Sequence, residues 1–134
     1  MALQLEKDRR CFVCGVENPH SLKVKVEQDG PNQVKAEFIA TDRYRGWSNY
    51  LHGGILSLVF DEMLGWLSYY RGHDAMTARL EVRYRKPVPL GSRLAFSGVL
   101  EREVKGILDI KLCATLEDGS LAAEGKGRMM IIKH

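Results

Sequence analysis

The chain has 134 residues, of which 45% are hydrophobic, and a formal net charge of +3. This length is typical of one domain, and this hydrophobic fraction is enough to build one core. Acidic and basic residues alternate along the chain, without the basic stripe and interleaved aromatics typical of a nucleic-acid interface. The composition therefore predicts one globular domain with no nucleic-acid partner.

The cysteines and the longest apolar stretch bear on the compartment. Three cysteines, an odd number, do not make a disulfide framework, and the first residues are too polar for a secretory signal. The longest apolar stretch, residues 53–70, carries Asp61 and Glu62 at its centre, where a membrane span tolerates charge least. We expect a soluble, cytoplasmic protein without a membrane partner.

The first part of the chain predicts a leader and a hairpin. Residues 1–20 show no clear period and are expected to precede a single domain at residues 21–134. Strict apolar–charged alternation over residues 22–26 predicts a half-buried strand. The turn residues at 29–32 separate it from a second alternating segment at 34–38, which predicts an antiparallel hairpin.

The middle of the chain predicts a functional loop and a long helix. Residues 41–52 are rich in aromatic and polar side chains, and such loops often carry function. Residues 53–70 are too long for a strand and apolar on nearly every face, so the helix must be enclosed by the rest of the protein. Arg71 and Gly72 are expected to end it.

The last part of the chain predicts four more strands, near residues 78–84, 92–103, 107–117 and 121–132. The turns between them are too short for parallel crossovers, so neighbouring strands are expected to be antiparallel. The expected order is β-β-α-β-β-β-β, an α+β domain in which an antiparallel sheet of about six strands wraps around one long buried helix.

The start of the helix and one of its acids are the candidate chemical groups. Gly53 and Gly54 open the helix, where backbone N–H groups lack partners and the dipole is positive, so they suit an oxyanion. Asp61 lies on an apolar helix, and a buried carboxylate there is costly unless it is paired or takes up a proton as a general base. The alternative is that Asp61 faces solvent or caps a backbone group.

Helix geometry predicts that these two groups work across a subunit boundary. Eight residues separate Gly53 from Asp61, about 12 Å along a helix. A base and an oxyanion donor must both lie within about 3 Å of the reacting group. If the two cooperate, they come from different subunits, and the protein is at least a dimer.

The string HGGILSLVFDEMLGW, followed by the segment from Thr77 to Pro87, resembles the hotdog-fold thioesterase superfamily. The similarity covers about residues 20–132, and is nearest to the phenylacetate-pathway and 4-hydroxybenzoyl-CoA thioesterase branch. The resemblance implies a hotdog fold and hydrolysis of an acyl-CoA to a carboxylic acid and coenzyme A. It also implies a homodimer or homotetramer with its site at the subunit interface, and no cofactor apart from the coenzyme A of the substrate.

The resemblance also implies roles for individual residues. The N–H of Gly53 polarises the thioester carbonyl, and Asp61 acts as general base or nucleophile. Thr77 holds the attacking water near the acid, and His52 orders the loop or forms a pocket wall. Family members often carry Asn or Gln six residues before the histidine, a position that is Gly46 here, so Asn49 is a candidate substitute.

Further substrate contacts are expected in the loop and at the end of a strand. Trp47 and Tyr50 are candidates for the acyl pocket, whereas Trp66 and Tyr69 are equally candidates for the core. Basic side chains that match phosphate oxygens follow one strand, with a solvated face as their alternative role: Arg79, Arg83, Arg85 and Lys86.

Cys11 and Cys14 resemble half of a zinc ribbon, but no second Cys-x2-Cys pair exists to complete four ligands. His20 and Cys113 complete such a site only if the fold or a second subunit brings them near. We therefore expect packing or substrate-edge contacts and no metal; a redox dithiol is less favoured, because no helix pattern follows.

Two other functions are open to this sequence. A hotdog hydratase or dehydratase typically pairs its acid with a catalytic histidine, and no histidine lies on the helix. A non-catalytic module would bind acyl-CoA without turnover, and replacing Asp61 would leave that binding intact.

Overall fold

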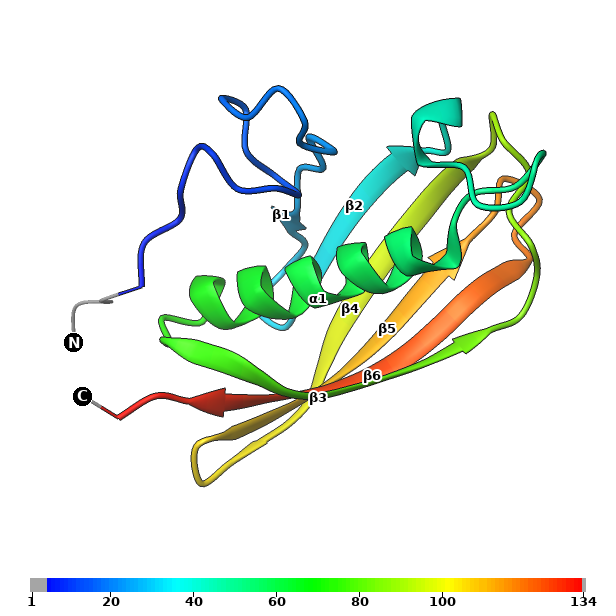
Figure 1. Ribbon diagram of the computed structural model, residues 1–134. Helices are drawn as coiled ribbons and strands as arrows, with labels where there is room; N and C mark the ends of the chain where they lie inside the picture. Colours follow the sequence, from blue (N-terminus) through cyan, green and yellow to red (C-terminus); the bar gives the residue numbers. More distant parts are fainter. Residues whose placement is uncertain (1–4, 134) are drawn as a thin grey trace.

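The computed structural model describes residues 5–133, which form one antiparallel sheet and one long helix (Figure 1). The elements are β1 (Glu27–Gln28), β2 (Gln33–Ile39), a 3-10 turn (Asp42–Tyr44), α1 (Gly53–Tyr70), β3 (Ala75–Tyr84), β4 (Arg93–Val104), β5 (Ile107–Thr115) and β6 (Leu121–Ile131). The strand order is β1-β2-β4-β5-β6-β3, and α1 crosses the inner face of the sheet. The predicted α+β architecture and element order are confirmed.

The core lies between α1 and the sheet. Phe60 and Leu64 are fully buried on the helix face that meets β6. The helix lies close to this strand because β6 carries glycines: a Cβ at Gly127 would lie 2.4 Å from the Leu64 side chain, and one at Gly125 would lie 3.3 Å from Phe60. Burying each such side chain stabilises the fold by about 1.5–3 kcal/mol. The two glycines therefore set the distance between helix and sheet.

The strand predicted at residues 22–26 is wrong as a sheet strand, although its alternation is real. Leu22, Val24 and Val26 are buried and the lysines between them are exposed. The backbone there donates hydrogen bonds to the leader instead, from Leu22 to the Phe12 carbonyl and from Val24 to the Val13 carbonyl. Alternation reports a half-buried extended chain, and does not say which segment accepts its hydrogen bonds. The predicted hairpin is confined to β1 and β2.

Strand β3 forms one edge of the sheet, and pairs only with β6 within the described chain. It begins at Ala75, three residues before the predicted start, and the register shifts between Thr77 and Arg79. Met76, Thr77 and Ala78 are exposed. A ten-residue strand with an unpaired edge is a ready partner for another strand.

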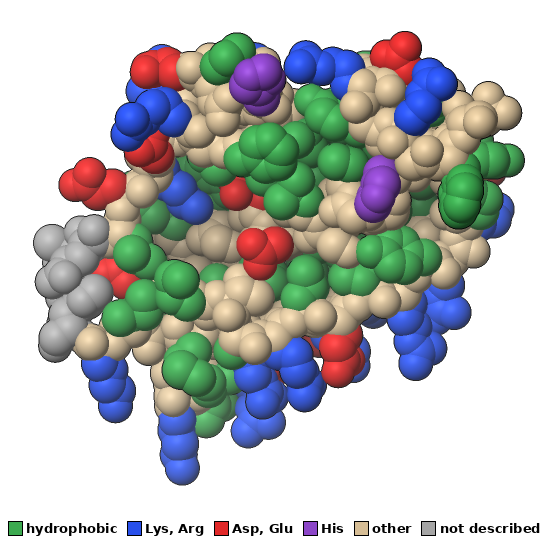
Figure 2. Space-filling model, in the orientation of Figure 1, with side chains coloured by type: hydrophobic (Ala, Val, Ile, Leu, Met, Phe, Trp, Pro, Cys, Tyr) green, Lys and Arg blue, Asp and Glu red, His purple; other side chains and the backbone are tan. Residues whose placement is uncertain are grey.

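The enclosure of α1 is incomplete in the single chain. The sheet covers one side of the helix and the leader covers another. A third face stays open, with Gly54 and Asp61 exposed along it. Figure 2 views this face, where hydrophobic surface and carboxylate groups lie together over the helix and the sheet edge.

Candidate active site

The start of α1 presents one free backbone donor. His52 is the N-cap, and its Nδ1 accepts a hydrogen bond of 2.9 Å from the N–H of Gly54. Within residues 5–133, the N–H of Gly53 has no partner in the chain. An unpaired N–H at the positive end of a helix is suited to a negative oxygen. His52 thus orders this turn, and leaves Gly53 as the available donor.

Tyr84, the last residue of β3, closes one side of this helix start. A Cβ at Gly53 would lie 3.3 Å from the Tyr84 ring, and the Tyr84 hydroxyl lies 2.5 Å from Oγ of Ser57. Neither Tyr84 nor Ser57 is among the site residues predicted from the sequence. The available signal was that Tyr84 alternates in phase with Leu80 and Val82, whose side chains are half-buried.

Asp61 and Thr77 meet on the open face of the helix. Thr77 donates a hydrogen bond of 2.7 Å from Oγ1 to Oδ1 of Asp61, which links β3 to the middle of α1. Asp61 is exposed, so of the two alternatives left open by the sequence, the solvent-facing carboxylate is the one found in the single chain. The reason is that only the sheet and the leader cover α1, and Asp61 projects between them.

Gly53 and Asp61 stay on separate parts of the helix, eight residues or about 12 Å apart. The single chain thus brings Asp61 together with Thr77, and Gly53 together with Tyr84. It does not bring the first pair close to the second. Hollows of the described residues occur on the outer face of the sheet, away from Asp61; one of about 300 Å³ is lined by Arg83, Lys111 and Lys126 among others. A substrate cleft over Asp61 needs a second surface.

The loop before α1 does not form a pocket in the single chain. Trp47 is 85% exposed and Tyr50 is 40% exposed. Asn49 is also exposed, and its carbonyl accepts a hydrogen bond from the N–H of Leu90. Close packing favours glycine at position 46, because a Cβ there would lie 3.0 Å from Cα of His52.

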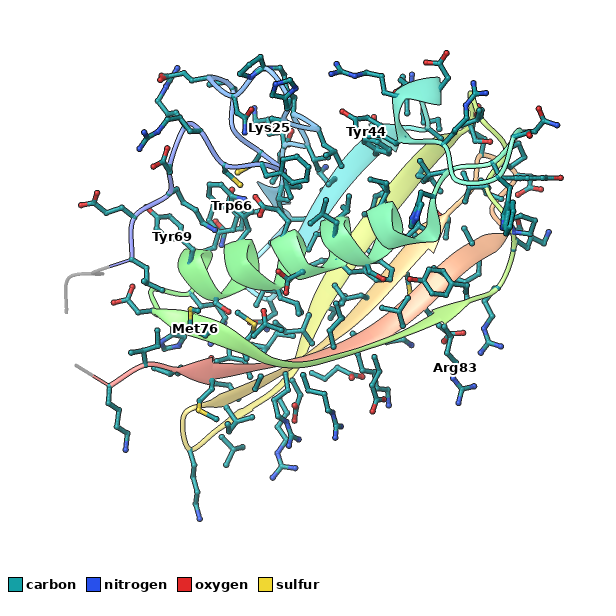
Figure 3. All side chains as sticks on the ribbon, viewed as in Figure 1. Lys25, Tyr44, Trp66, Tyr69, Met76 and Arg83 are labelled. Atoms are coloured by element: carbon teal, nitrogen blue, oxygen red, sulfur yellow. The ribbon has the colours of Figure 1, made fainter. Side chains whose placement is uncertain are left out.

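The basic residues of β3 and the turn after it are exposed, as predicted. Arg83 points away from α1, on the outer side of the sheet (Figure 3). Arg85 pairs with Glu124, and the N–H groups of Arg85 and Lys86 both donate to the Ala122 carbonyl. Arg85 and Lys86 directly follow Tyr84, whose ring lies beside the start of α1.

The leader packs against α1 through a cluster of sulfur, carboxylate and indole groups. Cys11 Sγ lies 3.8 Å from both carboxylate oxygens of Glu62, and Trp66 Nε1 donates to Glu62 Oε2 at 2.9 Å. Burial, reinforced by Glu62 and Cys11, raises the pKa of the Cys14 thiol far above its usual range. His20 and Cys113, the other candidate ligands, are not part of this cluster.

Trp66 packs against the edge of the core, whereas Tyr69 is exposed. They stack with Tyr70 at the end of α1, and the Lys7 ammonium lies 4.4 Å from the Trp66 ring centre. Figure 3 shows both side chains projecting from α1 on the side of the leader.

No family model matches the chain, but its architecture matches solved structures. A thioesterase superfamily protein has a TM-score of 0.84 and 28% identity, covering 92% of this chain and 63% of that chain. E. coli PaaI, from the phenylacetic acid degradation operon, has a TM-score of 0.77 and 15% identity, covering 84% and 81%. A hypothetical thioesterase from Streptococcus pneumoniae with coenzyme A has a TM-score of 0.77 and 17% identity, covering 83% of this chain and 87% of that chain.

One sheet curled over one long helix, shared with these proteins, is the hotdog fold. The chain has the same fold as these thioesterase superfamily proteins, as its sequence motifs indicated.

The Streptococcus pneumoniae protein offers one further comparison. It was also solved with an aspartate replaced by alanine, and separately with a threonine replaced by alanine. Those two positions are sixteen residues apart, the separation of Asp61 and Thr77 here.

Proposed function

We propose that this chain hydrolyses acyl-CoA thioesters to a carboxylic acid and free coenzyme A. The observation that carries this proposal is the hydrogen bond between Thr77 and Asp61 on the open face of α1. An aspartate and a threonine at the same spacing occur in a structurally similar protein, the hypothetical thioesterase from Streptococcus pneumoniae. Coenzyme A and acetyl-CoA in other similar structures support the substrate class.

In this reaction Asp61 accepts a proton from water, whose oxygen bonds to the thioester carbonyl carbon. Thr77 keeps one carboxylate oxygen in place through its hydroxyl, so that the other oxygen of Asp61 faces the water. The carbon–sulfur bond then breaks, and the proton passes to the departing coenzyme A thiolate. The alternative role of Asp61, as nucleophile, uses the same oxygen.

The carbonyl oxygen is stabilised by a backbone donor from a second chain. Gly53 is too far from Asp61 in one chain, so the N–H comes from Gly53 of the partner subunit. The exposed edge of β3 supports this arrangement, because pairing two β3 edges sets two helices side by side with their open faces adjacent. In the same pairing, the exposed loop with Trp47 and Tyr50 packs on the partner subunit and lines the acyl pocket. Both a dimer and a tetramer are compatible with this pairing.

The remaining substrate contacts follow from the position of the helix start. Arg85 and Lys86 supply positive charge for coenzyme A phosphates, while His52, Gly54 and Asn49 shape the turn around the carbonyl. The hydrolysis itself is proposed to need no metal or other cofactor. Within residues 5–133, no helix is long and apolar enough to cross a membrane; we propose a cytoplasmic location.

The test is release of free thiol from a panel of acyl-CoA substrates by the full chain and by Asp61→Asn. Hydrolysis that Asp61→Asn abolishes supports the proposal. Saturable acyl-CoA binding without thiol release from any substrate overturns it, in favour of a binding module. Addition of water across an enoyl-CoA, with no thiol release, overturns it in favour of a hydratase.

A further inference from the structure

Residues 11–15 of the leader form a turn in which backbone N–H groups surround a cysteine sulfur, as in loops that bind a thiolate. The N–H groups of Val13 and Cys14 point at Cys11 Sγ, at 3.4 and 3.5 Å. The turn closes with a hydrogen bond of 2.9 Å from Gly15 to the Cys11 carbonyl, and a Cβ at Gly15 would lie 2.4 Å from that oxygen. Successive backbone N–H groups aimed at one atom favour negative charge on it.

The helix brings a third ligand to this turn. Ligand atoms of Cys11, Cys14 and Glu62 all lie within 4.8 Å of one another. Around a tetrahedral zinc ion, with a zinc–sulfur distance of about 2.3 Å and a zinc–oxygen distance of about 2.0 Å, sulfur and oxygen lie about 3.5 Å apart. Cys11 Sγ lies 3.8 Å from each Glu62 oxygen, close to that separation and long for a thiol hydrogen bond.

A second group fixes the orientation of the carboxylate. The Trp66 indole donates to Oε2 of Glu62 at 2.9 Å, one helical turn further along α1. Outer hydrogen bonds of this kind orient metal-ligating carboxylates in proteins. With Oε2 held by Trp66, the Oε1 lone pairs of Glu62 remain for an ion.

We propose that Cys11, Cys14 and Glu62 bind one Zn²⁺ per chain, with water in the fourth position. Two thiolates and a carboxylate suit zinc, whereas magnesium and calcium prefer oxygen ligands alone. The sequence spacing disfavoured a metal because it offered only two ligands; the third comes from a helix about fifty residues later. The ion fastens the leader to α1 at Glu62, one residue beyond Asp61.

Zinc content of the full chain, purified without chelator, tests this proposal directly. We expect about one zinc per chain by mass spectrometry of the metal, and a sulfur-to-cobalt charge-transfer band after Co²⁺ replaces it. Affinity for Zn²⁺ is measured by competition against a chromophoric chelator. Cys113→Ser is the matched control, because Cys113 is another half-buried thiol of the described chain that lies outside the cluster.

The variants separate ligation from a loss of folding. Cys14→Ser and Glu62→Gln should each weaken Zn²⁺ binding by more than a hundredfold, and Cys113→Ser should not change it. Trp66→Phe, which keeps all three ligands, should weaken Zn²⁺ binding by about 10–100-fold. Folding of each variant is checked by circular dichroism.

The proposal is overturned if the wild-type chain purifies without zinc and does not take up Zn²⁺ at micromolar concentration. It is also overturned if Cys11 and Cys14 are found as a disulfide in freshly purified protein, or if Cys113→Ser loses zinc as fully as Cys14→Ser.

Discussion

Thr77, on the edge strand, and Asp61, in the middle of the helix, are joined by a hydrogen bond of 2.7 Å from the threonine hydroxyl to Oδ1. The bond fixes one oxygen of an exposed carboxylate against the sheet and leaves the other directed at the open face. It also couples the position of the acid to β3, the strand whose free edge is available to a second chain. The proposed base and the proposed dimer contact are therefore parts of one structural unit.

Replacing Asp61 with asparagine should abolish most of the hydrolysis. Asparagine keeps the shape and still accepts the Thr77 hydrogen bond, but does not take a proton from water. We expect kcat to fall by about 10²–10⁴ while acyl-CoA binding persists. The free energy of unfolding should not fall, because the substituted side chain is exposed.

The control for this change is Asp109→Asn, which removes a carboxylate on the outer face that pairs with Arg128. Full activity in that variant shows that the loss depends on position. If Asp61→Asn keeps near-normal thiol release, Asp61 is not the acid that this mechanism requires.

Thr77→Val removes the hydroxyl but keeps the branched side chain that suits a strand. A hydrogen bond to a charged group contributes about 1.5–3 kcal/mol, so kcat should fall by about 10–100-fold, and Thr77→Ser should recover most of it. Thr115→Val on β5 is the matched control, because its hydroxyl contacts only the Ala95 carbonyl. Equal activity of Thr77→Val and Thr115→Val would remove Thr77 from the mechanism.

The edge of β3 should carry the contact between two copies. Sedimentation of the purified chain at micromolar concentration should give a dimer or a larger assembly. Met76 is 58% exposed on β3, so Met76→Lys should leave the single chain folded, shift the protein towards monomer and lower activity in parallel. Val104→Lys, at the exposed end of β4, should change neither property. A fully active monomer would contradict the shared site.

Glu103 should make the stability of the fold depend on acid pH. Burial alone would raise the pKa of this carboxyl, but hydrogen bonds from Arg71 and His73 outweigh it and hold the pKa below its usual range. Because the folded-state pKa is the lower one, this stabilisation is complete above the ordinary glutamate pKa and is lost as the pH falls through the folded-state pKa.

Glu103→Gln should therefore lower the free energy of unfolding by about 1 kcal/mol at pH 7, a value reduced for partial solvent exposure. Near pH 3 the difference from the wild type should shrink, as Glu103 takes up its proton. Chemical denaturation at both pH values measures this, with Glu37→Gln, an exposed partner of Arg93, as the control. A difference that stays the same at both pH values would show that packing, and not charge, is lost.

Local pattern determined much of this molecule. The bounds of α1 followed from its apolar length, and from Gly72, which adopts a positive φ of 81° just after it. The three strands predicted between residues 92 and 132 match β4, β5 and β6 to within about two residues, because the short turns that separate them are marked locally in the sequence. The glycine pair and Asp61 were selected from residue type and spacing, whereas Thr77 was selected only through the family resemblance.

Tertiary packing decided what local pattern does not encode. The segment at residues 22–26 has the alternation of a strand, but its hydrogen bonds go to the leader, since alternation does not choose a partner. Asp61 reads as buried from its apolar neighbours and is exposed, because coverage of a helix depends on what packs over it. Glu62 meets Cys11 across about fifty residues of chain, and Tyr84 meets Gly53 only because β3 returns to the start of α1. Such contacts depend on the path of the whole chain, which no local spacing contains.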